Sequence, residues 1–146
     1  MNDKAHAIFA SARMYSKAAH VLNGTANSDR PMLIPSMVNA ALALELYFKS
    51  LYVLEHKTDF KIKGRHSHDF SAAFEELAGS TKQEFIEGFT NALAVRDMND
   101  VNIVERDFGM RIPRDLKTNL VEWSSVFTGV RYIYEFQFKP AGSQKT

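Results

Sequence analysis

Polar side chains interrupt an otherwise apolar stretch in the first half of the chain, and they are the first candidates for chemistry. Asn39, Glu45 and Lys49 lie among alanines, leucines and aromatic residues. Because a buried polar group must find a partner, we expect these side chains to be hydrogen-bonded or ion-paired. Glu45 precedes Lys49 by four residues, the order and spacing that favour an ion pair on one helix face.

Further polar groups fall where they could converge on this stretch. His68 and Asp69 stand at a predicted helix start, and Arg131 and Glu135 flank the apolar positions of the last segment. If the helices are neighbours, Arg131 can reach Glu45, and a buried arginine would need such a partner because an unpaired buried charge is costly. The pattern predicts either a purely structural network or a site for a ligand or phosphate group, and it leaves both open.

Arg13 and His20 form a second, weaker candidate in the first predicted helix. Six residues separate them, so both lie along one helix edge, about 10 Å apart by the helical rise. A histidine there could act as general acid or base on a ribose hydroxyl, with the arginine stabilising a phosphate oxyanion. The alternative is that the two residues form the polar rim of an amphipathic helix.

The run His66-Ser67-His68-Asp69 raises a metal interpretation, since two imidazoles and a carboxylate suit zinc or manganese. Metal-dependent phosphohydrolases of the HD type use a His-Asp pair together with an upstream histidine and a downstream aspartate. The chain offers His20 or His56 and Asp97 or Asp115 for these roles, but nothing in the sequence marks them. Helix capping by Ser67 and Asp69 is the favoured explanation of the run. The sequence therefore predicts no metal site, and without a glycine-rich phosphate loop or dinucleotide fingerprint it predicts no cofactor.

Composition narrows the class of protein. The chain of 146 residues has no cysteine, which excludes disulfide scaffolds, thiolate zinc sites and cysteine nucleophiles. A net charge of +1 argues against a protein that binds duplex nucleic acid through a large overall positive charge. One local basic stretch, Lys57, Lys61, Lys63 and Arg65 with Asp59, reads as a solvated loop or a local nucleic-acid contact. No secretory signal is visible, and the apolar run 40–44 is far shorter than the ~20 residues of a membrane span, so we expect a cytoplasmic protein without membrane contact.

Apolar spacing predicts the helices that position these residues. A first helix, capped by Asp3 and ended by Asn23-Gly24, places one face at Ala5, Ile8, Ala12, Tyr15, Ala19 and Leu22. A polar loop over 23–35 follows. The segment 36–56 is apolar nearly all round, which is typical of a helix in the middle of a bundle.

The second half predicts shorter elements. Ser67 is expected to cap a short helix with a stripe at Phe70, Ala73, Phe74 and Leu77 that ends at Gly79. Thr81 and Glu84 form a capping box for the next helix, whose stripe is Phe85, Phe89, Ala92 and Leu93. Residues 97–113 are expected to form a long loop, with a short extended piece at 101–104. The last helix carries a heptad-like seam suited to antiparallel packing or to a partner subunit: Leu116, Leu120, Trp123, Phe127, Val130 and Tyr134.

These elements predict an all-α fold, an up-and-down bundle of four to five helices in a single domain over 1–146, with 1–3 and 140–146 as frayed tails. Three of them also resemble motifs of the HEPN domains (higher eukaryotes and prokaryotes nucleotide-binding). These are the helix Asn39 to Lys49, the turn Ser67-His68-Asp69-Phe70, and the aromatic element Arg131-Tyr132-Ile133-Tyr134-Glu135. The likeness covers most of residues 36–138.

The resemblance implies an all-α homodimer that cleaves RNA in many members and serves binding or dimerisation in others. The residues that we expect to bind a ligand are Asn39, Glu45, Lys49, His68, Asp69, Arg131, Tyr132 and Glu135. Nuclease members carry an arginine followed after four to six residues by a histidine, whereas Arg131 is followed at that distance by Gln137 and Phe138. The expected function is thus a homodimeric binding or regulatory module for RNA or nucleotides, with a cognate protein partner. The alternative is a metal-independent ribonuclease of a toxin-antitoxin or defence system.

Overall fold

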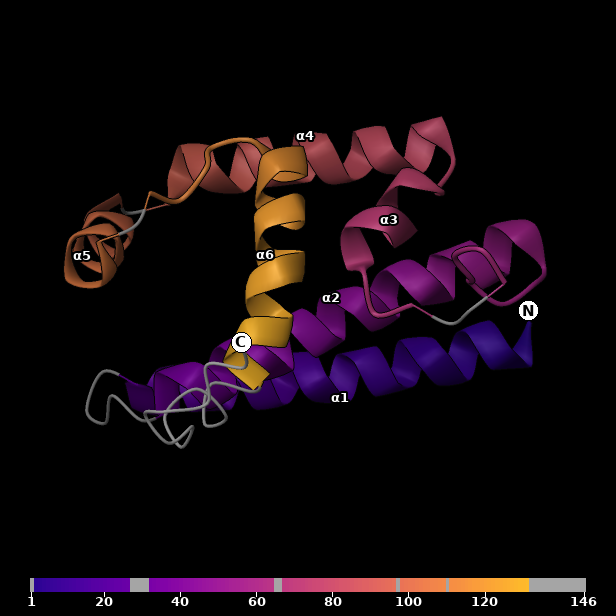
Figure 1. The fold of residues 1–146 in the computed structure, drawn as a ribbon, viewed down its shortest axis with the longest axis horizontal. Coiled ribbons are helices and arrows are strands. Elements are labelled where there is room, and N and C mark those ends of the chain that lie inside the picture. Colours follow the sequence, from indigo (N-terminus) through magenta and orange to yellow (C-terminus); the bar gives the residue numbers. More distant parts are fainter. Residues whose placement is uncertain (1, 27–31, 65–66, 97, 110, 132–146) are drawn as a thin grey trace, which may run out of the picture.

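The described part of the chain is all-α. The computed structural model describes residues 2–26, 32–64, 67–96, 98–109 and 111–131, and no strand occurs among them. Six helices follow one another in that part: α1 (Asp3–Ala26), α2 (Leu33–His56), α3 (Phe70–Glu75), α4 (Gly79–Val95), α5 (Met98–Phe108) and α6 (Leu116–Arg131). Figure 1 shows α1 and α2 lying along one another, α4 above them, and α6 running between these two levels.

Small side chains bring α1 and α2 together as an antiparallel pair. Ala5, Ala12 and Ala19 are buried on α1, and Ser36, Ala43 and Ser50 are buried on α2, so both helices carry a small residue at every seventh position. The Ser50 hydroxyl donates to the Ala5 carbonyl oxygen over 2.8 Å, and the Ser36 hydroxyl donates to that of Ala19 over 2.9 Å. A serine side chain is short, so its hydroxyl reaches the backbone of the other helix only if the two helices pack closely. We call these six residues the small-residue seam.

The ends of this helical pair differ from the prediction. Asn2, rather than Asp3, caps α1, because its side-chain oxygen accepts from the backbone N–H groups of Lys4 and Ala5. The helix continues to Ala26, past the predicted stop at Asn23-Gly24, and α2 begins at Leu33 instead of within a loop lasting to Pro35. A proline in the first turn is compatible with a helix, since its missing N–H would have no intrahelical partner there.

The core lies on the side of α2 away from α1. Phe48 of α2 is fully buried with Phe70 and Phe74 of α3, and the rings of Phe48 and Phe74 are 5.4 Å apart. Phe85 of α4 closes on Phe48 edge to face at 5.2 Å. Leu120 of α6 is buried in the same cluster. The predicted central position of α2 is therefore confirmed, and so is the buried stripe of α3.

Two helix starts in this region are capped differently from the prediction. Asp69 is the N-cap of α3, accepting from the backbone N–H of Ala72 over 3.1 Å, whereas Ser67 accepts from the N–H of Asp69 itself. Gly79 begins α4 instead of ending α3. The predicted capping box is absent, because the Thr81 hydroxyl donates to Glu55 of α2 over 2.6 Å. Glu55 also accepts from the N–H of Ala78, so the start of α4 is held by a side chain of another helix.

The predicted long loop over 97–113, with its extended piece, is wrong. Residues 98–108 form α5, which Figure 1 shows apart from the α1–α2 pair. Gly109 has a positive φ of 63° and follows the last helical residue, so it ends this helix. The described residues thus contain more helices than the four to five predicted, and α6 runs across α2 rather than alongside it (Figure 1).

One helix passes a length and composition test for membrane spans. Residues Pro35–His56 are 22 residues long with a window of mean hydropathy 1.3, and one third of that window is buried. The core helix of a water-soluble protein passes the same test, so the observation is weak support for a span. The segment also carries Glu45 and Lys49 at its middle, which would be costly in lipid.

Candidate functional site

The buried carboxylate of Glu45, on α2, contacts two side chains that can carry a positive charge, one on its own helix and one before α3. Its side chain is 4% exposed, and its Oε1 accepts a hydrogen bond from Lys49 Nζ over 2.6 Å. The same Oε1 lies 3.0 Å from Nδ1 of His68, which precedes α3. The predicted pairing of Glu45 with Lys49 is confirmed. We call Glu45, Lys49 and His68 the Glu45 cluster.

The short turn before α3 sets the position of His68. Ser67 and Asp69 bracket it, and each accepts a backbone N–H of the turn or the first helical residues. Behind the turn, Phe70 is buried against the core, so the chain cannot shift without exposing an aromatic ring. The histidine is therefore anchored on both sides, while 72% of its own side chain stays exposed.

The contact between His68 and Glu45 defines which imidazole nitrogen is available. A carboxylate oxygen accepts, so Nδ1 carries the hydrogen and donates to Oε1. In the neutral ring, Nε2 is then the acceptor, on a side chain that is largely in solvent. A carboxylate that orients an imidazole in this way produces a group whose Nε2 accepts a proton or hydrogen bond from a bound molecule when the ring is neutral, and donates a hydrogen bond when the ring is protonated.

The second oxygen of Glu45 is unusual. Oε2 is buried and has no hydrogen-bond partner among the residues that the structure describes. Leaving a buried acceptor unsatisfied costs about 1–3 kcal/mol, more when it is charged. The cluster therefore has an unused acceptor behind its exposed histidine, which a donor group from a ligand or another part of the chain could satisfy.

The other predicted binding residues do not join this cluster, or cannot be compared with it. Asn39 is half-buried and donates to the Pro35 carbonyl oxygen of its own helix over 2.8 Å. Asp69 serves as the cap of α3. Arg131 ends α6, but its side chain, like Tyr132 and Glu135, lies outside the described residues, and so does the predicted contact of Arg131 with Glu45.

The structure also shows where the residues of the two alternative sites lie, the Arg13–His20 pair and the metal site. Arg13 and His20 are both exposed on α1, and neither is among the partners of Glu45. Within the described ranges, no three side chains of His, Asp or Glu are grouped so that they could hold a metal ion. His66, and Asp97 as one of the two aspartates nominated for the metal interpretation, lie outside those ranges.

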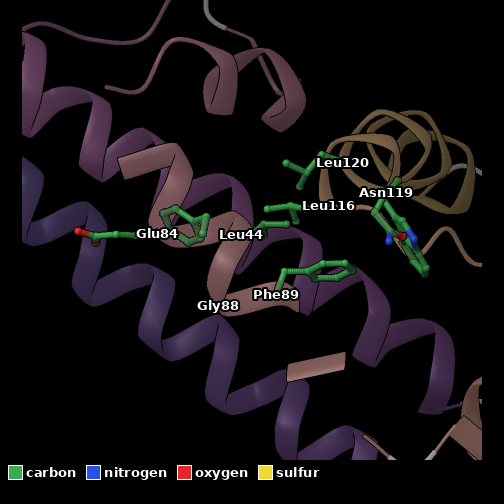
Figure 2. Close-up of a pocket in the computed structure, with 9 residues that line it drawn as sticks. Leu44, Glu84, Gly88, Phe89, Leu116, Asn119 and Leu120 are labelled. Carbon is green, nitrogen blue, oxygen red and sulfur yellow. The ribbon is translucent and has the colours of Figure 1, made fainter. Parts of the chain in front are cut away.

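Sequence reasoning missed an apolar groove with a volume of about 600 Å³. Its walls come from three helices, as Figure 2 shows, with Leu44 of α2, Phe85 and Phe89 of α4, and Leu116, Leu120 and Trp123 of α6. The Glu84 carboxylate points away from the other labelled side chains (Figure 2), and the Asn119 amide donates to the Pro113 carbonyl oxygen. The groove thus offers apolar contact and few polar groups.

The groove also explains the first half of the predicted heptad-like seam. Leu116, Leu120 and Trp123 face α2 and α4, so these positions serve packing within the chain. Phe127 and Val130 lie in α6 with side chains outside the described set, and Tyr134 lies beyond it.

Comparisons with models of protein families, with curated proteins and with solved structures found no match.

Proposed function

We propose that the chain is a HEPN-like binding or regulatory module of the cytoplasm that takes a phosphate group of RNA or of a nucleotide at the Glu45 cluster. One observation carries the proposal. Glu45 and His68 belong to two separate elements of the resemblance and are 23 residues apart in sequence, yet their side chains meet at 3.0 Å. A contact between both elements is what a common site requires.

The donors of the cluster suit an anionic ligand. Lys49 offers an ammonium group that is 18% exposed, and His68 offers an imidazole at the surface. Glu45 offsets the lysine charge, so a neutral His68 leaves the cluster without net charge, whereas a protonated one makes it cationic. HEPN-like self-association would set two such clusters in one particle.

Titration calorimetry with ATP and with a 12-nucleotide single-stranded RNA tests this proposal. We expect binding that His68→Ala and Lys49→Ala each weaken by about tenfold, the effect of losing one charge-assisted hydrogen bond. His56→Ala and Lys117→Ala are matched controls on exposed residues outside the cluster and should leave binding unchanged. Binding that survives both cluster substitutions would contradict the proposal, as would the absence of binding by the parent protein.

A metal-independent ribonuclease is the second candidate, favoured by the orientation of His68. In that reaction Nε2 takes the proton of a ribose 2′-hydroxyl, the 2′-oxygen forms a bond to phosphorus, and the bond from phosphorus to the 5′-oxygen breaks. The leaving 5′-oxygen takes a proton from water. The products are a 2′,3′-cyclic phosphate and a 5′-hydroxyl end, with no oxidant or metal consumed.

Cleavage of a labelled RNA in the presence of EDTA separates the two candidates. If His68 is the base, His68→Ala should reduce the rate by about 10²–10⁴-fold, the usual range for a general base. Glu45→Gln should reduce kcat more than it raises KM, because it alters the orientation of the imidazole. Arg13→Ala and His20→Ala address the earlier candidate pair: loss of cleavage in these variants alone would move the reaction to α1.

A further inference from the structure

The outer face of α1, turned away from the small-residue seam, carries a second row of apolar residues. Ala7, Ala10, Met14 and Val21 recur at steps of three, four and seven, so they share one face of the helix. All four are exposed, and Met14 and Val21 are 71% and 67% exposed. A helix normally buries such a row, and α1 already packs on α2 through the opposite face. We call these four residues the outer seam.

A basic row borders the outer seam on one flank. His6, Arg13, Lys17 and His20 recur at steps of seven, four and three, which places them within an arc of about 60° at 100° per residue. All four side chains are exposed. The row extends over about 21 Å at 1.5 Å per residue. Asp3, in the first turn, is the only acidic residue of α1, so no carboxylate of this helix neutralises the row.

From these two rows we infer that the outer face of α1 docks an amphipathic helix with acidic flanks, supplied by a protein partner. The outer seam matches the apolar face of such a helix, and the basic row matches its acidic flank. Apolar side chains as exposed as Met14 and Val21 contribute little to a phosphate backbone, which favours a protein over a nucleic acid. The inference concerns a surface separate from the Glu45 cluster.

The charges also argue against a second copy of this chain as the occupant. An antiparallel two-fold pair of α1 helices would set the basic row of one copy against that of the other. A parallel pair would set it against the opposite flank, which has no acid either, because Asp3 alone is acidic. Neither arrangement supplies the negative charge that the row requires.

Fluorescence anisotropy with a designed peptide tests the inference on the full chain. The probe is a labelled 21-residue peptide with leucine at the seam positions of three heptads and glutamate at the flanking positions. A second peptide carries lysine in place of each glutamate. We expect the glutamate peptide to bind at least about tenfold more tightly than the lysine peptide, with an affinity that falls as salt is added.

Variants assign the binding to the outer face. Met14→Glu should weaken binding of the glutamate peptide by at least about tenfold, whereas Val121→Glu, on an exposed valine of α6, should not. The pair Arg13→Glu and Lys17→Glu should also weaken it, compared with the matched pair Lys57→Glu and Lys61→Glu. Circular dichroism establishes that each variant stays folded.

Four results would overturn the inference: no binding of the glutamate peptide, equal binding of both peptides, equal loss in the control variants, or light scattering that shows a dimer dissociated by Met14→Glu. Binding of a 12-nucleotide RNA that depends on Met14 would equally replace the protein partner by a nucleic acid. Because Met14 belongs to no candidate binding site and the Glu45 cluster is intact in Met14→Glu, binding of ATP to this variant should be unchanged, which keeps this test separate from that of the proposed function.

Discussion

Replacing Ala12 by leucine tests whether the small-residue seam sets the distance between α1 and α2. Ala12 is 0% exposed, and the serine contacts at both ends of the seam fix the register so that it faces Ala43. Leucine adds three heavy atoms where the other helix already lies. Inserting carbon atoms into a packed interface costs about 1–3 kcal/mol, sometimes more, and three atoms between two close backbones call for the upper end, about 3 kcal/mol.

Thermal unfolding followed by circular dichroism measures this effect. For a domain of this size, 1 kcal/mol corresponds to about 2–4 °C in Tm, so Ala12→Leu should lower Tm by about 6–12 °C. Ala10→Leu is the matched control, because Ala10 lies on the same helix but is exposed. Alanine and leucine are both strong helix formers, so the control should change stability by less than about 0.5 kcal/mol. Equal Tm values for the two variants would refute the seam as the determinant of helix spacing.

Three further predictions concern other parts of the molecule. Gly88→Ala should raise stability by about 0.5–1 kcal/mol in denaturant titrations, because a Cβ on this helical glycine meets nothing within 4 Å; a loss of stability would contradict the open groove. The double variant Glu45→Leu with Lys49→Met should have a free energy of unfolding near that of the parent, whereas Glu45→Leu alone should lower it by several kcal/mol. An equal loss of stability in both variants would mean that the ion pair itself stabilises the fold. Hydrogen bonds from Arg114 and Ile112 lower the pKa of Glu105 below 4.5, and those from Thr118 lower the pKa of Asp115 below 3.8. A lowered folded-state pKa stabilises the protein above the ordinary value, so Tm should fall as the pH drops below about 4.5, and less steeply in Glu105→Gln.

Local patterns in the sequence predicted what depends on local spacing. The apolar stretch of α2 indicated a buried helix, and the order of Glu45 and Lys49 indicated their ion pair; both are confirmed. The convergence of His68 on Glu45 was within reach because a polar residue on a buried face needs a partner. These inferences work because a helix has a fixed period, so sequence spacing alone places residues on a face.

Features that depend on contacts between distant segments were missed. Glu55 accepts the N–H of Ala78, at the start of α4, from 23 residues away, and nothing in the sequence around Ala78 reveals this. The loop predicted over 97–113 was wrong because its many charges concealed the helical spacing of Met98 and Val101, and Gly109 ends a helix there instead of marking a loop interior. The apolar groove required the placement of α4 against α6, which the loop lengths did not determine.

Three consecutive residues of α2 face three different neighbours, and this links the seam to the candidate site. Ala43 faces α1 in the small-residue seam, Leu44 lines the groove with α4 and α6, and Glu45 meets His68 beside α3. Consecutive helical residues are about 100° apart, so a rotation of α2 that moves one of these side chains moves all three. The seam resists such a rotation, because it places small residues between α1 and α2 and the hydroxyls of Ser36 and Ser50 fix the register of the two helices. The direction of the Glu45 carboxylate is therefore determined by alanines and serines on the opposite side of α2, the side that packs against α1.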